Sequence, residues 1–212
     1  MATINHGVMG GFSGKVGTVV GGNWNGIDYM RTRQPKRNDA KSNAQLDQRL
    51  RFSTVVQFLK PFKPFFNVGF KNRKAGISVF NAATSVNLRN AITGTYPDYS
   101  IDYSKVKVSM GTMPSALNPA VVNGPADELL FTWENNYDRI GALGNDKVVL
   151  LVYNPYNKKL VTLFEGNSRM AGNQAFTLPN GFGRENLQCY IAFRNARLTD
   201  ISDSQYVGSI NI

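Results

Sequence analysis

The residues of this chain that could take part in catalysis are few and far apart. His6 is the only histidine, and Cys189, the only cysteine, lies near the other end of the chain within the strand-like stretch LQCYIAF. A Cys–His or Ser–His–Asp mechanism needs a histidine beside the nucleophile, and one histidine with one cysteine cannot form a zinc site. We therefore expect Cys189 to be a buried, inert thiol and the protein to have no catalytic residue, metal or cofactor.

Two motifs that often bind ligands are incomplete. The stretch GGFSGKVGT resembles a phosphate-binding loop, but Val16 stands where that loop needs Ser or Thr after the lysine. The acidic residues of the second half show no calcium-loop spacing, and no carboxylate pair is singled out for glycosidase chemistry. We expect them to be solvated loop charges: Asp127, Glu128, Glu134, Asp138 and Asp146.

The strongest polar feature is a group of cations that follows two aromatic residues. Residues 1–110 hold sixteen Lys/Arg against five Asp/Glu, whereas residues 111–212 hold eight against nine. This asymmetry indicates contact with a polyanion or with an acidic surface of another subunit. The cations could hold phosphates while the aromatic rings stack on bases, or Trp24 could anchor a contact between copies that arginines fix in register. The residues are Trp24, Tyr29, Arg31, Arg33, Lys36 and Arg37.

Residues 1–37 are predicted to form a glycine-rich β-hairpin arm. Val16, Val19 and Val20 favour one strand, Asn25 and Gly26 favour a turn with positive φ, and the return strand follows with Ile27, Tyr29 and Met30. An isolated hairpin is marginally stable in water, and glycines weaken its first strand. We expect this arm to dock on its own domain or on another copy of the protein.

Residues 38–99 are predicted to form a short helical pair. The first helix covers residues 40–62, with Asn38 or Asp39 as its cap, and Pro61 and Pro64 break or kink it. The second covers residues 75–92 and ends before Gly94. The phenylalanines around residues 62–70 are typical of core packing. A second basic group, Lys71, Arg73 and Lys74, follows them.

Residues 100–212 are predicted to form a seven-stranded antiparallel sandwich of immunoglobulin or fibronectin type III kind, so the fold class is α+β. The spacing of strand-like stretches motivates this prediction. Trp133 is a candidate for the core between the two sheets. The seven stretches are residues 103–111, 128–135, 146–155, 159–166, 173–179, 187–196 and 204–212.

Several stretches together resemble an uncharacterised family of domain-of-unknown-function proteins abundant in Bacteroidota. They are residues 10–33, QLDQRLRFSTVVQFLKPF, VYN, LPNGF, and YIAFRNA with SDSQYVG, so the resemblance runs from end to end. The N-terminal pattern is also similar to short phage and prophage proteins, through Gly14, Gly17, Arg31, Pro35, Gln45, Arg49 and Phe52. The resemblance implies one unit with a virion-like or other assembled role, and it implies no catalytic residue.

From these features we expect a non-catalytic structural subunit that self-assembles through its N-terminal arm into a ring, filament or virion-like particle. The alternatives are a nucleic-acid-binding protein that uses the basic half, and a glycan-binding or carbohydrate-active sandwich with Tyr153 and Tyr156 beside acidic residues in a cleft. We expect no membrane span and no standard signal peptide. The protein would then be cytoplasmic or part of a particle released without such a signal.

Overall fold

The computed structural model describes residues 2–4, 10–24, 26–35, 42–71, 76–125, 128–183 and 185–212. The chain forms two compact units, residues 1–43 and residues 44–212. His6, Lys36, Arg37, Asn38, Asp39, Arg73, Lys74 and Asp127 lie outside the described residues.

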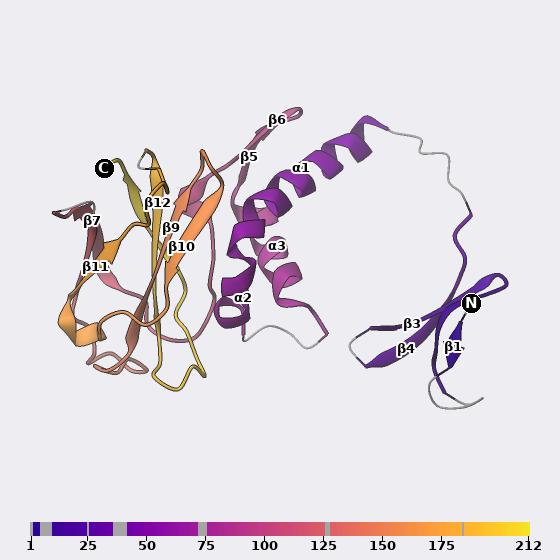
Figure 1. Cartoon of the computed structure of the whole chain (residues 1–212), viewed down its shortest axis with the longest axis horizontal. Coiled ribbons are helices and arrows are strands. Elements are labelled where there is room, and N and C mark those ends of the chain that lie inside the picture. The colour runs from indigo at the N-terminus through magenta and orange to yellow at the C-terminus, as the bar shows by residue number, and fades with distance from the viewer. Residues whose placement is uncertain are drawn as a thin grey trace. The chain divides into compact units, whose positions relative to one another are not determined.

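The N-terminal unit is an antiparallel sheet of four strands in the order β1-β2-β3-β4 (Figure 1). The strands are β1 (Thr3–Ile4), β2 (Phe12–Val16), β3 (Val19–Trp24) and β4 (Ile27–Thr32). The predicted hairpin is present as β3 and β4, but Val16 lies on β2 rather than on the hairpin's first strand. Gly17 and Gly26 occupy the two turns with φ of 57° and 83°. These glycines permit two reversals where one was predicted.

The helical region follows the predicted proline breaks closely. Helix α1 (Asn43–Leu59) ends two residues before Pro61, and a 3-10 turn, η1 (Lys60–Phe62), leads into α2 (Lys63–Gly69). Pro61 and Pro64 stand in the first turns of η1 and α2, where a missing N–H costs nothing. Helix α3 (Val79–Asn90) begins after Ser78, whose Oγ accepts a hydrogen bond from the Asn81 N–H at 3.2 Å.

The predicted second helix is too long at its C-terminal end. Residue Ile92 instead begins a hairpin of β5 (Ile92–Thr95) and β6 (Asp98–Ile101). At Gly94 φ is 92°, and a Cβ there would lie 2.2 Å from the Asp98 carbonyl oxygen. The glycine expected to end a helix therefore belongs to a strand pair that only glycine allows.

In the described part of the C-terminal region, seven strands form two antiparallel sheets. One sheet has the order β10-β9-β12-β13 and the other β11-β8-β7, so the α+β class is confirmed. The first comprises β9 (Lys147–Asn154), β10 (Lys159–Leu163), β12 (Leu187–Arg194) and β13 (Gln205–Ile210), and the second β7 (Leu117–Asn123), β8 (Glu128–Glu134) and β11 (Asn173–Thr177).

The four-stranded sheet is covered on both faces, which makes the second unit a three-layer structure (Figure 1). On β9, Leu151 belongs to a core shared with the helices, whereas Leu150 belongs to a core shared with the three-stranded sheet. On β12, Tyr190 belongs to the core shared with the helices and Ile191 to the core shared with the three-stranded sheet. The alternation in these strands therefore separates two cores rather than core from solvent.

One of the seven predicted strands is wrong and one strand was missed. Residues 103–111 form the 3-10 turn η2 (Tyr103–Lys105) and an irregular segment, because side chains satisfy their backbone. The Lys107 and Val108 N–H groups donate to Asn87 Oδ1 and Ser204 Oγ at 2.9 Å each. The missed strand is β7, an edge strand that tolerates Pro119.

Candidate interaction surface

The register of the N-terminal hairpin brings the predicted aromatic and cationic residues onto one face of the sheet. Directly paired residues of antiparallel strands point to the same side. Trp24 pairs with Ile27, Gly22 with Tyr29, and Val20 with Arg31. Because side chains alternate along each strand, Trp24, Tyr29 and Arg31 share that side.

Two further cations extend this surface. Lys15 on β2 pairs with Val20, which places it in one row with Arg31 across three strands. The Arg33 N–H donates to the Thr18 carbonyl at 2.7 Å, so the alternation continues past the end of β4 and Arg33 follows Arg31 on the same side. We call this surface the cationic–aromatic face. Its residues are Lys15, Val20, Trp24, Ile27, Tyr29, Arg31 and Arg33.

The glycines of β3 explain how a sheet this small holds large rings. A Cβ at Gly22 would lie 3.0 Å from the Tyr29 hydroxyl oxygen, and a Cβ at Gly21 would lie 2.6 Å from the Phe12 ring. With hydrogen in place of a side chain, each ring lies against the strand backbone, Tyr29 on one side of the sheet and Phe12 on the other. The glycine-rich opening of the chain thus makes space for aromatic rings.

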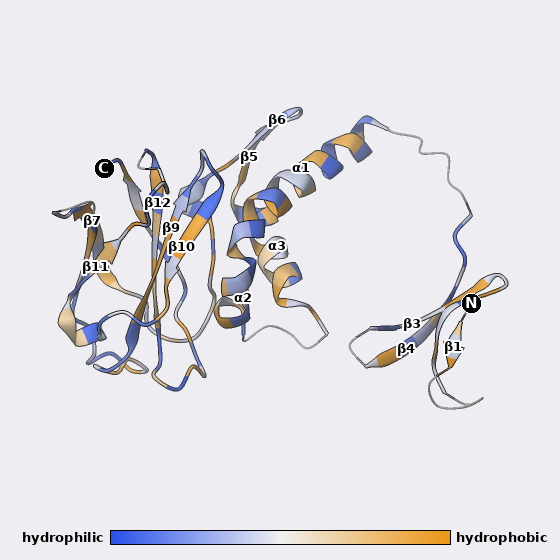
Figure 2. Ribbon diagram, in the orientation of Figure 1, coloured by the Kyte–Doolittle hydropathy of each residue, from blue (hydrophilic) through white to orange (hydrophobic). Residues whose placement is uncertain are grey.

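The opposite side of the sheet carries apolar side chains from all four strands, beside Asn23, Asp28 and Thr32. Ile4 pairs with Phe12, and Val16 pairs with Val19 on the side to which Met30 also points. Met30 is 72% exposed, and Ile4 and Val16 are exposed by more than half. We call this surface the apolar face; Figure 2 shows hydrophobic residues along these strands. Its residues are Ile4, Phe12, Val16, Val19 and Met30.

The single acidic residue among the described residues of this sheet is turned away from the cations. Asp28 pairs with Asn23, on the side opposite Tyr29, and accepts a hydrogen bond from Asn23 Nδ2 at 2.7 Å. The Asn23 Oδ1 in turn accepts the Gly26 N–H at 3.1 Å, which ties the pair to the hairpin turn. Within the described part of the sheet, the cationic–aromatic face therefore carries three positive charges and no carboxylate.

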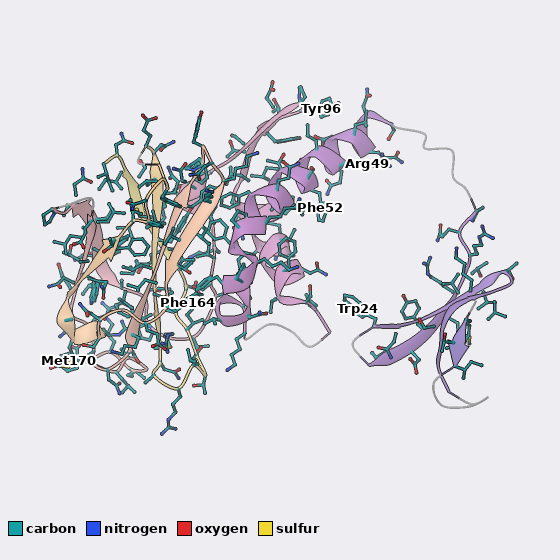
Figure 3. The ribbon with its side chains drawn as sticks, viewed as in Figure 1. Trp24, Arg49, Phe52, Tyr96, Phe164 and Met170 are labelled. Atoms are coloured by element: carbon teal, nitrogen blue, oxygen red, sulfur yellow. The ribbon has the colours of Figure 1, made fainter. Side chains whose placement is uncertain are left out.

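The sequence located four of this face's residues but missed Lys15, Val20 and Ile27. Ile27 could have been found from the turn at Gly26, since that turn sets the register of β3 against β4. Lys15 could not, because its place depends on the pairing of β2 with β3. Trp24 is 53% exposed and projects from the end of β3 (Figure 3).

The second unit holds a buried ion pair that resembles a functional site in composition. Arg169 Nε lies 3.1 Å from Asp146 Oδ2, and the guanidinium also donates to Asn136 Oδ1 and to the Pro114 carbonyl at 2.8 and 3.0 Å. Its Cζ lies 3.9 Å from the centre of the Phe193 ring. Burial lowers the pKa of Arg169, and Asp146 opposes that shift.

The contacts of this ion pair hold neighbouring loops together and indicate a structural role. Arg169 is fully buried and Asp146 nearly so, and the Leu143 N–H also donates to Asp146 Oδ2 at 2.8 Å. Trp133, the expected core tryptophan, is buried and donates from Nε1 to the Arg169 carbonyl at 2.8 Å. The guanidinium therefore joins three loops at one end of the sandwich and faces no solvent-filled space.

The candidate nucleophile Cys189 lies inside the fold, and His6 lies outside the described residues. Cys189 is fully buried, and burial raises the pKa of its thiol to about 12, which keeps it protonated. Within the ranges that the structure describes, no group of three His, Cys, Asp or Glu side chains could hold a metal ion. No helix in the described part of the chain is long and apolar enough to cross a membrane.

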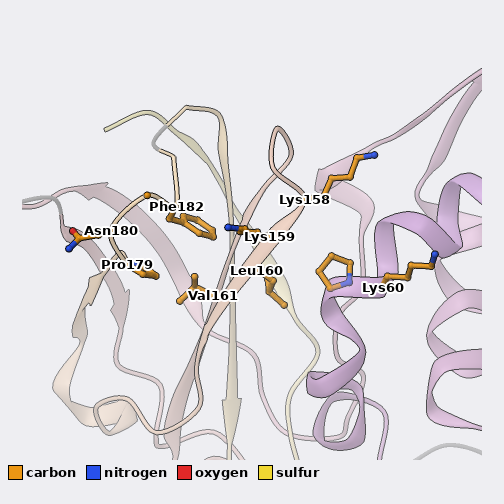
Figure 4. A pocket seen from close by; sticks show the side chains of 10 residues that line it. Lys60, Lys158, Lys159, Leu160, Val161, Pro179, Asn180 and Phe182 are labelled. Carbon is orange, nitrogen blue, oxygen red and sulfur yellow. The ribbon is translucent and has the colours of Figure 1, made fainter.

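An open groove of about 570 Å³ lies between the helices and the sandwich (Figure 4). Lys60 of η1, Lys158 before β10 and Lys159 at the start of β10 border it, and Leu160 and Phe182 contribute apolar lining. Tyr156 lines a neighbouring pocket with Glu185, but Tyr153 is buried in the helical core. The two tyrosines therefore do not line one cleft, as the glycan-binding alternative requires.

The comparison with known proteins gives one finding. A model of a family of unknown function, DUF6266, matches residues 11–208. The chain belongs to the DUF6266 family. The match spans both the N-terminal sheet and the sandwich, so the predicted membership of an uncharacterised domain-of-unknown-function family is confirmed. No curated protein and no solved structure shows a significant similarity to this DUF6266 chain.

Proposed function

We propose that the protein is a non-catalytic structural subunit whose copies associate through the apolar face of the N-terminal sheet. One observation carries this proposal: the described residues of the first unit include seven exposed large hydrophobic residues, and none of them belongs to either hydrophobic core. Four of them, Ile4, Val16, Val19 and Met30, belong to the apolar face. Exposed apolar surface of this kind marks sites of protein association.

A second copy of the chain is the partner that the sheet favours. Strand β4 is an edge, and its outer backbone groups can extend a sheet of another copy. Because β4 would join a different surface of the second copy, this is a head-to-tail contact. Such a contact closes into a ring or propagates as a filament, including a virion-like assembly.

The platform that carries this arm is a sandwich of fibronectin type III kind. Its support is the strand order. With β7 to β13 lettered A to G, one sheet holds A, B and E and the other holds D, C, F and G. An immunoglobulin constant domain keeps its fourth strand beside A, B and E, whereas the fibronectin type III variant pairs it with the third strand.

Light scattering of three full-length variants tests the association. The double variant Val16→Ser/Met30→Ser removes apolar surface from the apolar face, and we expect it to lower the assembled mass to that of a monomer. Tyr156→Ser is the matched control, because Tyr156 is 95% exposed in the second unit. Trp24→Ala, on the other face, should keep the mass of the unaltered protein.

Truncation gives the larger change. A chain lacking residues 1–37 keeps both hydrophobic cores, which are built from the second unit alone. We expect it to be a folded monomer by circular dichroism and light scattering. Assembly of the truncated chain to the same mass as the full chain would show that the N-terminal sheet is not the association site.

A further inference from the structure

The cationic–aromatic face combines two properties that the apolar face lacks. Lys15 and Arg31 flank Val20 in one row, and Arg33 follows Arg31 along the chain. None of the three has an ion-pair partner among the described residues. Their positive charges are therefore available to an anionic ligand.

The aromatic residues of the same face are presented for stacking. The Tyr29 ring lies against Gly22. A Cβ added to Gly22 would lie 3.0 Å from the Tyr29 hydroxyl oxygen and 3.4 Å from its Cε1. One side of the ring thus contacts backbone while 45% of the residue remains exposed. Trp24 and Ile27 form the next pair toward the turn, and Trp24 is 53% exposed.

We propose that this face binds single-stranded nucleic acid, with Trp24 and Tyr29 stacking on bases and Lys15, Arg31 and Arg33 contacting phosphates. Residues two apart on a strand are separated by about 6.7 Å and point to the same side, so Tyr29, Arg31 and Arg33 lie in one row along the strand. Base–aromatic stacking beside a cationic track is how proteins bind single strands without reading sequence. A duplex hides its base faces, so the single strand is the preferred form.

This function goes beyond self-association and uses the other side of the sheet. Asp28 is the one carboxylate among the described residues of the sheet. Asn23 holds it on the apolar side, so it does not face or repel phosphates bound on the other side. The two proposals can therefore fail separately. Loss of assembly in the Val16→Ser/Met30→Ser variant should leave binding of a single strand intact.

The test uses the full chain and a fluorescein-labelled oligothymidylate, with a duplex of equal length for comparison. We expect the single strand to bind at low salt more tightly than the duplex. Trp24→Ala should weaken the affinity for the single strand by about 5- to 150-fold, which is the contribution of one stacked base. Trp24→Phe should keep most of the affinity, since a phenyl ring still stacks.

The chain's own fluorescence provides a second readout. Trp24 and Trp133 are its only tryptophans, and Trp133 is buried. Binding should quench the emission of Trp24, and the Trp24→Phe variant should bind without this quenching. Arg31→Gln and Arg33→Gln should each reduce the slope of log affinity against log salt by about 0.7. Lys159→Gln, which removes an exposed cation from the second unit, should leave the slope unchanged.

Four results would overturn the proposal. The first three are no binding at low salt, equal binding of duplex and single strand, and unchanged affinity in Trp24→Ala. The fourth is loss of binding in the Val16→Ser/Met30→Ser variant, which would locate the binding site between copies. Heparin distinguishes a general polyanion site. If heparin of equal charge displaces the oligonucleotide and Trp24→Ala binds normally, charge alone accounts for binding and the stacking role is wrong.

Discussion

The two units of this protein use strands in opposite ways. In the second unit, β9 and β12 are buried on both faces, with residues such as Leu150 and Leu151 in separate cores. In the first unit, all six residues of β4 are exposed, and no described residue of the unit belongs to either hydrophobic core. Burial of apolar area stabilises the second unit, whereas the first has apolar area still to bury. This difference supports the proposal that one unit is a platform and the other a contact surface.

The largest expected effect tests the platform. Replacing Arg169 by Ala would leave Asp146 as a buried charge without its partner, which costs about 3–5 kcal/mol. Chemical denaturation followed by Trp133 fluorescence measures this loss. Arg31→Ala, a change of the same type in the first unit, is the control and should alter the midpoint little. Equal losses in the two variants would remove the contrast between the units.

The next effect tests whether the helices belong to the platform. Leu150→Ala and Leu151→Ala create cavities on opposite sides of β9, and each should lower the free energy of unfolding by about 2–5 kcal/mol. Thermal or chemical denaturation compares them. A loss below about 1 kcal/mol for Leu151→Ala alone would indicate that the helices pack loosely on the sheet.

A smaller effect concerns alkaline pH. Burial, then the neighbouring Tyr103, raises the pKa of Tyr153 to about 12, and burial raises the pKa of Tyr190 well above its usual value. The unfolded chain ionises these phenols near pH 10 while the folded chain does not. Stability is therefore fully present below pH 10 and is lost between about pH 10 and 12.

The size of this loss is about 1.4 kcal/mol for each unit of pKa difference. Denaturation at several pH values measures it, and Tyr153→Phe should flatten the decline. In an ultraviolet absorbance titration, the buried Tyr153 and Tyr190 should ionise only as the protein unfolds. A single titration of all tyrosines without unfolding would contradict the assigned burial.

The smallest effect is expected in the first unit. Trp24→Ala and Met30→Ala remove exposed side chains that neither core includes. We expect each to change the free energy of unfolding of the second unit by less than about 0.5 kcal/mol. A loss above about 2 kcal/mol, measured under conditions in which both the variant and the unaltered protein are monomers, would mean that the sheet packs on its own platform.

Local signals account for the elements that could be predicted. The Gly26 turn, the prolines at 61 and 64 and the strand-like stretches from 128 onward act through residues near in the chain, and the corresponding hairpin, helix end and strands are present. The segment 103–111 looked like a strand because Val106 and Val108 alternate with polar residues. Its backbone instead bonds to Asn87 and Ser204, which are distant in sequence and leave no local trace.

For the candidate surface, the sequence alone determined the residue types of the arm: glycines, two aromatic residues and a group of cations within residues 10–37. It also determined that Trp24, Tyr29 and Arg31 follow one another near a tight turn. Only the tertiary structure decided that Lys15 joins them, that Asp28 faces away, and that Tyr29 lies on Gly22. The physical reason is register. Composition is a property of the chain, whereas the side of a sheet on which a residue lies depends on which strands pair and at which residue they begin.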